Sequence, residues 1–183
     1  MPPSVESCSP LHLIPVRAVA FDTPRGYTVR GAAAYRAEPM DSEGLRPSLR
    51  PFLLGARVAR LGTVGPDGLP HLIPFCFALS GERIVSVVDR KPKRTTDLRR
   101  LRNIRADPRV VVLVDHYEEN WSRIWWIRSH GIATILEAGP EWEEGIDRLV
   151  EKYSQYRFVR PTGAVISIVP ERWTSWSGDG LKP

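Results

Sequence analysis

A four-residue segment, Gly-Pro-Asp-Gly at residues 65–68, constrains the fold of this chain most strongly because it is a turn signal between two apolar runs. Proline presets the backbone angle of the first central turn position, and glycine accepts positive φ. The flanking residues 56–64 and 69–79 have the apolar, β-branched character of strands. The segment therefore predicts an antiparallel hairpin. Pro70 and Pro74 place its second strand at a sheet edge or at a bulge.

The rest of the chain alternates similar runs with two helical patterns. Leu98, Leu101 and Ile104 share one face of a helix predicted over residues 95–106, for which Thr95 or Thr96 supplies the cap. A second helix is predicted over residues 140–156. We expect a short helix within residues 45–54, and further strands at residues 83–89, 109–115, 122–137 and 163–169. The strand at 109–115 is almost wholly apolar, so we expect it to be buried on both faces. This order predicts a mainly β (α+β) fold, an antiparallel sheet or small barrel with helices packed outside.

Residues 1–39 differ in composition from the remainder of the chain. They hold six of the 17 prolines and only seven charged residues, without a sustained apolar period. Such a composition offers little surface to bury. We therefore expect residues 1–39 to be a disordered extension, or to follow from a start codon placed too early, and residues 40–183 to form the domain.

Positive charge is concentrated in one window. Residues 90–109 hold nine of the 26 basic residues and two acids, whereas the rest of the chain is slightly acidic. Lys91, Lys93 and Arg94 lie between a predicted strand and a predicted helix, where backbone N–H groups, the helix dipole and cationic side chains can bind phosphate. Thr95 can add a hydroxyl donor. The glycine-rich spacing of a nucleotide-hydrolase phosphate loop is missing, so we expect a different kind of anion site.

Several classes of protein are disfavoured by the sequence. No apolar run approaches the ~18–20 residues that a membrane-spanning helix needs. Two cysteines cannot build a disulfide framework, and the four histidines lack metal-ligand spacing. No Gly-x-Ser-x-Gly elbow is present for a serine nucleophile. We therefore expect a cytoplasmic protein without a metal and without a membrane partner, and no catalytic side chain can be named.

Aromatic residues form a second candidate feature. Trp125 and Trp126 are neighbours on a predicted strand and must point to opposite faces. One of them is expected in the core, while the other can line a groove or contact a partner subunit. A planar ligand can stack on such a ring.

Six segments of the sequence are considered together: ARVARLGTV at 56–64, GPDGLPHLIP at 65–74, KPKR at 91–94, LRNI at 101–104, DPRV at 107–110, and the tryptophan pair ahead of Gly131. Together they resemble the pyridoxamine 5′-phosphate oxidase-like split β-barrels. Within that superfamily they are most similar to the actinobacterial branch that uses the deazaflavin coenzyme F420. The resemblance covers residues 45–178, nearly everything after the extension.

The resemblance implies a six-stranded split barrel, a homodimer, and F420 lying in a groove between subunits. It implies that the segment with Lys91, Lys93, Arg94 and Thr95 grips the cofactor phosphate together with the adjoining strand at Val87. The ring system would lie over Ile73 and Pro74, and groups around Asn120 and Trp125 would complete the pocket. The implied activity is hydride transfer between F420 and a small organic substrate.

Three alternatives remain open from the sequence. The same fold can bind FMN as an oxidase or reductase of the pyridoxamine-phosphate-oxidase type, or hold a cofactor without catalysis. A nucleic-acid-binding module would use the basic window as a phosphate footprint, but it ranks last because no recognition motif accompanies the charge.

Overall fold

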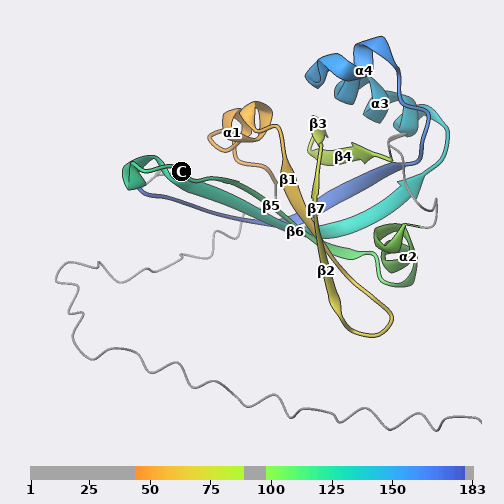
Figure 1. The fold of residues 1–183 in the computed structure, drawn as a ribbon, viewed down its shortest axis with the longest axis horizontal. Coiled ribbons are helices and arrows are strands. Elements are labelled where there is room, and N and C mark those ends of the chain that lie inside the picture. Colours follow the sequence, from red (N-terminus) through yellow and green to blue (C-terminus); the bar gives the residue numbers. More distant parts are fainter. Residues whose placement is uncertain (1–43, 89–97, 180–183) are drawn as a thin grey trace, which may run out of the picture. The chain divides into compact units, whose positions relative to one another are not determined.

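The computed structural model describes residues 44–88 and 98–179, and the fold is built on antiparallel strands (Figure 1). Its helices are α1 (Arg50–Gly55), α2 (Arg99–Ala106), α3 (Pro140–Lys152) and α4 (Ser154–Phe158), with a 3-10 turn η1 at Trp121–Arg123. Its strands are β1 (Ala59–Val64), β2 (Pro70–Phe75), β3 (Ala78–Ser80), β4 (Arg83–Val87), β5 (Arg109–His116), β6 (Trp125–Leu136) and β7 (Val165–Ser177).

The seven strands of the described residues form one sheet in the order β2-β1-β5-β6-β7-β4-β3. Only Cys76 and Phe77 separate β2 from β3, although these strands stand at opposite ends of that order. Consecutive Cα atoms are about 3.8 Å apart, so Phe75 and Ala78 lie within about 11 Å of each other. The sheet must therefore coil until its two edges approach. The result is an open barrel, the mainly β architecture that the sequence predicts.

The strand count differs from the expected six. Residues 69–79 were predicted as one strand, but they form β2 and β3 at the two edges of the sheet. A single straight strand cannot serve both edges, so the chain turns at Cys76 and Phe77. The edge position expected from Pro70 and Pro74 is confirmed, because β2 pairs with β1 alone.

The predicted hairpin joins β1 to β2. Gly68 donates its N–H to the carbonyl of Gly65 at 2.8 Å and has a φ of +74°, which a residue with a side chain rarely adopts. Asp67 accepts the backbone N–H of Leu69 at 3.1 Å. The turn residues therefore do what their sequence pattern predicts.

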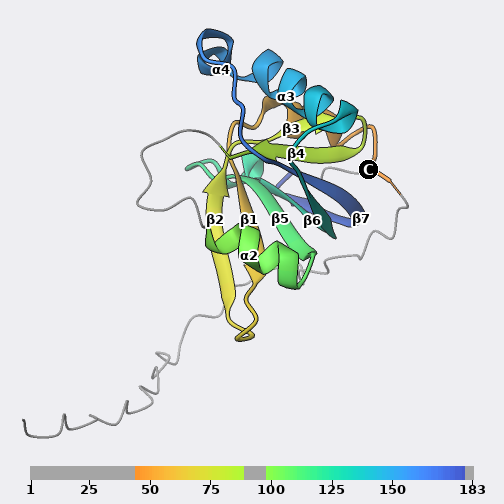
Figure 2. The same ribbon diagram turned by 90° about the vertical axis from the view of Figure 1, so that its right-hand side faces the viewer.

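The main core fills the inside of the coiled sheet, and α1 and α2 each add apolar side chains to it. Leu53 of α1 is fully buried, as are Leu61 and Ile84 on the strands. Helix α2 lies against the sheet (Figure 2), and its Leu101 and Ile104 join the same cluster with the spacing that the sequence predicts. The helix itself begins at Arg99 with Leu98 at its N-cap, and the predicted caps Thr95 and Thr96 lie outside the described residues.

A second cluster lies where α3 covers β3 and β4 (Figure 2). Ile146 and Leu149 are fully buried there against Val85 and Val165. The helix predicted over residues 140–156 is interrupted at Tyr153, which separates α3 from α4. Tyr153 has an extended backbone there, with φ of −118° and ψ of 112°.

The Tyr153 hydroxyl connects three parts of the chain. It accepts the N–H of Phe77 at 3.0 Å and lies 2.7 Å from the carbonyl oxygen of Arg57 and 2.9 Å from that of Phe77. Beside it, the Lys152 ammonium donates to the carbonyl of Leu53 at 3.0 Å and lies 3.8 Å from the centre of the Phe77 ring. Burial raises the pKa of Tyr153 to about 12, and burial with the charge of Arg57 lowers the pKa of Lys152 to about 8.

Strands β6 and β7 form the longest ladder. A register shift lies between His130 and Gly131, at the predicted interruption, and a Cβ on Gly131 would strike the Val169 carbonyl. Strand β7 runs to Ser177, eight residues beyond its predicted end. Strand β5 was expected to be buried on both faces, but only its Val110, Val112 and Val114 face is fully buried. No helix among the described residues is long and apolar enough to cross a bilayer.

Tyr153→Phe tests the junction around Tyr153, which is the set of hydrogen bonds that its hydroxyl makes to Phe77 and Arg57. The substitution leaves the buried Phe77 N–H without its acceptor, so we expect the free energy of unfolding to fall by about 1–3 kcal/mol. Urea denaturation measures this free energy of unfolding. Tyr117→Phe is the control because Tyr117 is exposed, and it should change stability by less than about 0.5 kcal/mol. Equal stability of the two variants would contradict the assigned role of the hydroxyl.

Candidate functional site

A pocket of about 120 Å³ lies where the two edges of the barrel approach. Strand β2 borders one side of it with Ile73 and Pro74, and the end of β4 borders the other with Ser86 and Val87. The pairing of β3 with β4 ends at Val85, so Ser86 and Val87 lie beyond the strand that covers the rest of this edge. The remaining lining residues are Leu61, Phe75, Cys76, Arg100, Tyr156 and Ile166. The pocket therefore lies in the gap between the two approaching edges of the sheet, which we call the split of the barrel.

One cationic side chain in the first turn of α2, that of Arg100, lines this pocket. The position of the helix depends on a buried hydrogen bond, in which the Asn103 amide donates to the Thr63 hydroxyl at 3.0 Å. A second contact holds its start, since the Arg99 guanidinium lies 3.4 Å from the Asp67 carboxylate of the hairpin. The hairpin and the helix together place a positive charge at the apolar pocket.

The imidazole of His71 lies on β2, two residues from Ile73 and on the same side of the strand. Its Nδ1 atom is buried and has no hydrogen-bond partner within the described part of the chain. Burial, followed by the charges of Arg99 and Arg100, lowers the pKa of His71, so the ring is neutral at pH 7. A buried polar atom without a partner is costly. The Nδ1 atom of His71 can therefore hydrogen-bond a polar group that comes close to Arg100.

The structure brings together three of the predicted site residues. Ile73, Pro74 and Val87 line the one pocket. The predicted phosphate-binding residues Lys91, Lys93, Arg94 and Thr95 lie outside the described residues. Their segment connects β4 to α2, and both of these elements contribute side chains to the pocket.

Two predicted residues lie elsewhere in this chain. Trp125 lines a separate pocket of about 320 Å³ with Phe52 and His116, and its ring centre is 5.1 Å from that of Phe52. Asn120 caps η1, where its side-chain oxygen accepts the backbone N–H of Ser122 at 3.2 Å. The two pockets share no lining residue. One chain therefore does not bring Asn120 and Trp125 to the split of the barrel.

Comparison with known proteins agrees with this geometry. The model of the family described as pyridoxamine 5′-phosphate oxidase matches residues 45–177, which is most of the chain. The chain belongs to the pyridoxamine 5′-phosphate oxidase family. A search of the curated proteins gives no match.

Solved structures support the fold assignment to this family. A conserved hypothetical protein from Mycobacterium tuberculosis is 23% identical with a TM-score of 0.62, and the alignment covers 78% of this chain and 89% of that one. An FAD-binding protein from Mesorhizobium loti is 20% identical with a TM-score of 0.54, over 72% and 94% of the two chains. A heme storage protein from Vibrio cholerae is 17% identical with a TM-score of 0.57, over 73% and 94%. The fold thus carries both flavin-binding and heme-storing proteins.

Sequence reasoning missed several residues of the pocket in this member of the oxidase family. Arg100 was not separated from the basic face of its helix, although it lies in the basic window. No local sequence pattern marks Ser86 or Tyr156 as a residue of a binding site. Cys76 is half-buried and also lines the pocket, and no sequence pattern indicated this position. Only the coiling of the sheet brings these residues to one place.

Asn103→Ala tests how the family's barrel positions α2. It leaves the Thr63 hydroxyl buried without its donor, so we expect the free energy of unfolding to fall by about 1–3 kcal/mol, measured by urea denaturation. Arg105→Ala on the same helix is the control, because Arg105 is exposed and its nearest carboxylate oxygen lies 3.9 Å away. If both variants lost the same stability, the Asn103 contact would not be what holds the helix.

Proposed function

We propose that this protein binds the deazaflavin coenzyme F420 and transfers a hydride between it and a small organic substrate. The observation that carries the proposal is the pocket in the split of the barrel. It contains Ile73, Pro74 and Val87, and the basic segment of residues 91–94 connects two elements that border it. Membership of the oxidase family supports a cofactor of the flavin type.

The residues of the pocket fit one part of such a cofactor. Leu61, Ile73 and Ile166 provide apolar surface for a planar ring, and Arg100 provides a positive charge. The volume of about 120 Å³ is smaller than the ~300–1,000 Å³ of most small-molecule sites. The remainder of a flavin-sized molecule must therefore lie outside this pocket, along the open side of the barrel.

When bound, the deazaflavin supplies hydride chemistry, and the side chains of this chain orient and shield it. The edges of β2 and β4 would hold the ring between them. Arg100, with Lys91, Lys93, Arg94 and Thr95, would neutralise the phosphate. The unpartnered Nδ1 of the neutral His71 would offer a hydrogen bond to a polar group that enters beside Arg100.

A homodimer belongs to the same proposal. The sheet face that points away from the core exposes apolar side chains: Leu72 of β2 is 67% exposed and Val169 of β7 is 50% exposed. A second copy of the chain packed on this face would remove both side chains from water. A second copy on this face would also let Asn120 and Trp125 of one subunit approach the pocket of the other.

An FMN-dependent oxidase or reductase is the second candidate, favoured by the description of the family and by the FAD-binding neighbour. A cofactor holder without turnover is the third, and the neighbour described as a heme storage protein favours it. The three candidates differ in what they bind and in whether they turn over.

Titration of the purified full chain with F420 and with FMN tests the proposal. We expect F420 fluorescence to be quenched with saturation, and FMN to bind more weakly. Tight FMN binding with no response to F420 would reject the first candidate. With reduced F420 bound, oxidation by one of a panel of quinones or enones is expected, whereas no turnover with any of them would favour the cofactor holder.

Lys93→Ala tests the basic segment. Loss of a charge-assisted contact to the phosphate should weaken F420 binding by about 1.5–3 kcal/mol without unfolding the domain. Equilibrium titration measures the affinity and thermal unfolding measures the stability. Arg148→Ala is the control: Arg148 lies on α3 in an ion pair with Glu151, and its loss should leave the affinity unchanged. Equal affinities of the two variants would remove Lys93 from the site.

A further inference from the structure

A larger pocket, of about 540 Å³, lies between α1, β3 and α3, and we call it the α1–α3 pocket. Its volume is within the ~300–1,000 Å³ of most small-molecule sites. It shares no lining residue with the pocket in the split. Its lining combines apolar and charged side chains: Arg50, Leu54, Ala78, Leu79, Gly81, Arg148, Glu151 and Lys152.

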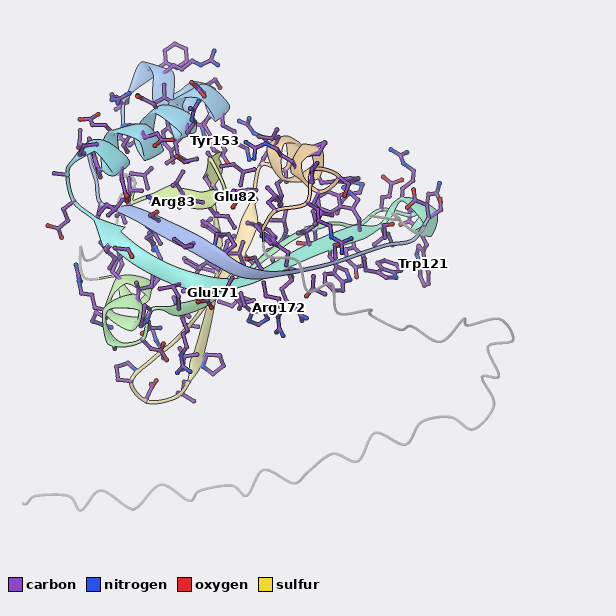
Figure 3. All side chains as sticks on the ribbon, turned by 180° about the vertical axis from the view of Figure 1, so that it is seen from behind. Glu82, Arg83, Trp121, Tyr153, Glu171 and Arg172 are labelled. Carbon is purple, nitrogen blue, oxygen red and sulfur yellow. The ribbon has the colours of Figure 1, made fainter. Side chains whose placement is uncertain are left out.

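The α1–α3 pocket lies away from the sheet face on which a second copy of the chain is proposed. Leu72 of that face belongs to a row of register partners that ends at Arg172 of β7, and direct cross-strand partners share one face. Figure 3 shows Arg172 on the side of the sheet away from Tyr153, which follows Lys152 at the end of α3. A dimer formed through Leu72 and Val169 would therefore leave this pocket open to solvent.

Lys152 brings an amine to the α1–α3 pocket. Its Nζ atom donates to the carbonyl of Leu53 at 3.0 Å and lies 3.8 Å from the centre of the Phe77 ring. Within the described residues it forms no ion pair with a carboxylate, and the neighbouring Glu151 is paired with Arg148 at 3.1 Å. The amine is thus held in place without a counter-ion.

The surroundings of Lys152 disfavour its charged form. The Arg57 guanidinium donates to the Lys152 carbonyl and lies 4.5 Å from the centre of the Tyr153 ring, so a second cation stands beside the amine. Burial, followed by the charge of Arg57, lowers the pKa of Lys152 to about 8, although the nearby Cys76 thiol opposes the shift. At pH 8 about half of this amine is neutral, whereas an ordinary lysine is less than about 1% neutral. A neutral amine can attack a carbonyl carbon.

The residue type at position 152 fits this chemistry. The chain has 26 lysine and arginine residues, of which four are lysines. Within residues 44–88 and 98–179, Lys152 is the lysine and the other such positions are arginine. A buried lysine loses its proton readily, whereas an arginine stays charged. Lys152 therefore provides a nucleophile that the arginines around it cannot provide.

Arg50 supplies a positive charge to the same pocket. It lies on α1 three residues before Leu53 and four before Leu54, and residues at this spacing are neighbours on a helix surface. Its Nη1 atom donates to the Gly81 carbonyl at 3.2 Å, which leaves further guanidinium N–H groups for a ligand. One guanidinium matches the single charge and the two oxygens of a carboxylate.

We propose that the α1–α3 pocket binds a small aldehyde that carries a carboxylate, and that Lys152 forms a reversible imine with it. The Nζ atom attacks the carbonyl carbon, a C=N bond replaces the C=O bond, and the oxygen leaves as water with the two amine protons. No oxidation or reduction takes place. Arg50 binds the carboxylate, and Leu54 and Leu79 contact the carbon atoms of the ligand. The reaction uses none of the residues assigned to F420, so it stands whether or not the protein binds that cofactor.

Reductive trapping on the full chain, with no cofactor added, tests the proposal. The protein is incubated at pH 8 with limiting 4-carboxybenzaldehyde and sodium cyanoborohydride, which reduces an imine to a stable amine, and peptide mapping by mass spectrometry locates the label. We expect Lys152 to be labelled about tenfold more than Lys91, Lys93 or Lys182, because more of its amine is neutral. Benzaldehyde is the matched probe without an acid group. Relative to the α-amine of the chain, it should label Lys152 about fivefold less.

Arg50→Gln separates binding of the acid group from the reactivity of the amine. We expect it to lower labelling of Lys152 by 4-carboxybenzaldehyde about fivefold and to leave labelling by benzaldehyde unchanged. Arg105→Gln removes an exposed arginine of α2 outside the pocket and is the control, which should change neither. Thermal unfolding checks that each variant is folded, and the comparison of the two aldehydes on the wild type does not depend on a variant.

Three results would overturn the proposal. The first is labelling of another lysine as heavily as Lys152. The second is equal labelling of Lys152 by the two aldehydes in the wild type. The third is a loss of labelling in Arg105→Gln as large as in Arg50→Gln.

Discussion

The short link between β2 and β3 is the constraint on which the rest of the structure depends. Two residues, Cys76 and Phe77, join strands that end the sheet on opposite sides. The sheet can satisfy this link only by coiling, which encloses one core and leaves a gap between its edges. The pocket follows from the gap, because Ile73 and Pro74 reach it from one edge and Val87 from the other.

The sequence predicts local structure well where one residue type permits one conformation. Glycine with positive φ at position 68 identifies the first hairpin, and the prolines at 70 and 74 identify the edge strand. Prediction from the sequence fails where a contact between residues far apart in the sequence determines the local structure. The apolar period of α3 continues through Tyr156, yet the helix breaks at Tyr153, whose hydroxyl binds backbone atoms of two other segments. The second half of β7, residues 170–177, begins with a proline and two charged residues and has no sustained apolar period, so it was missed, although β6 pairs with both halves of the strand.

The sequence likewise predicts some residues of the candidate site and misses others. Ile73, Pro74 and Val87 came from resemblance to a family, and the fold brings them together. Arg100 and Ser86 could not be found from sequence, since their place at the pocket depends on the Asn103 contact and on where β3 stops pairing. Within one chain, Trp125 lines a different pocket and Asn120 caps η1. A site composed of such separated parts agrees with the proposal that two subunits share it.

The junction around Tyr153 links folding to the uptake and release of protons. The pKa of Lys152 is about 8 in the folded chain, below its ordinary value of about 10.5, so at pH 9 folding releases a proton from this residue. Between pH 8 and 10 the unfolded chain binds more protons at Lys152, and stability rises with pH. The pKa of Tyr153 is about 12 instead of its ordinary value of about 10, so the unfolded tyrosine ionises first and stability falls above pH 10. Two adjacent residues thus give this fold a contribution to stability that is greatest on the alkaline side of neutrality.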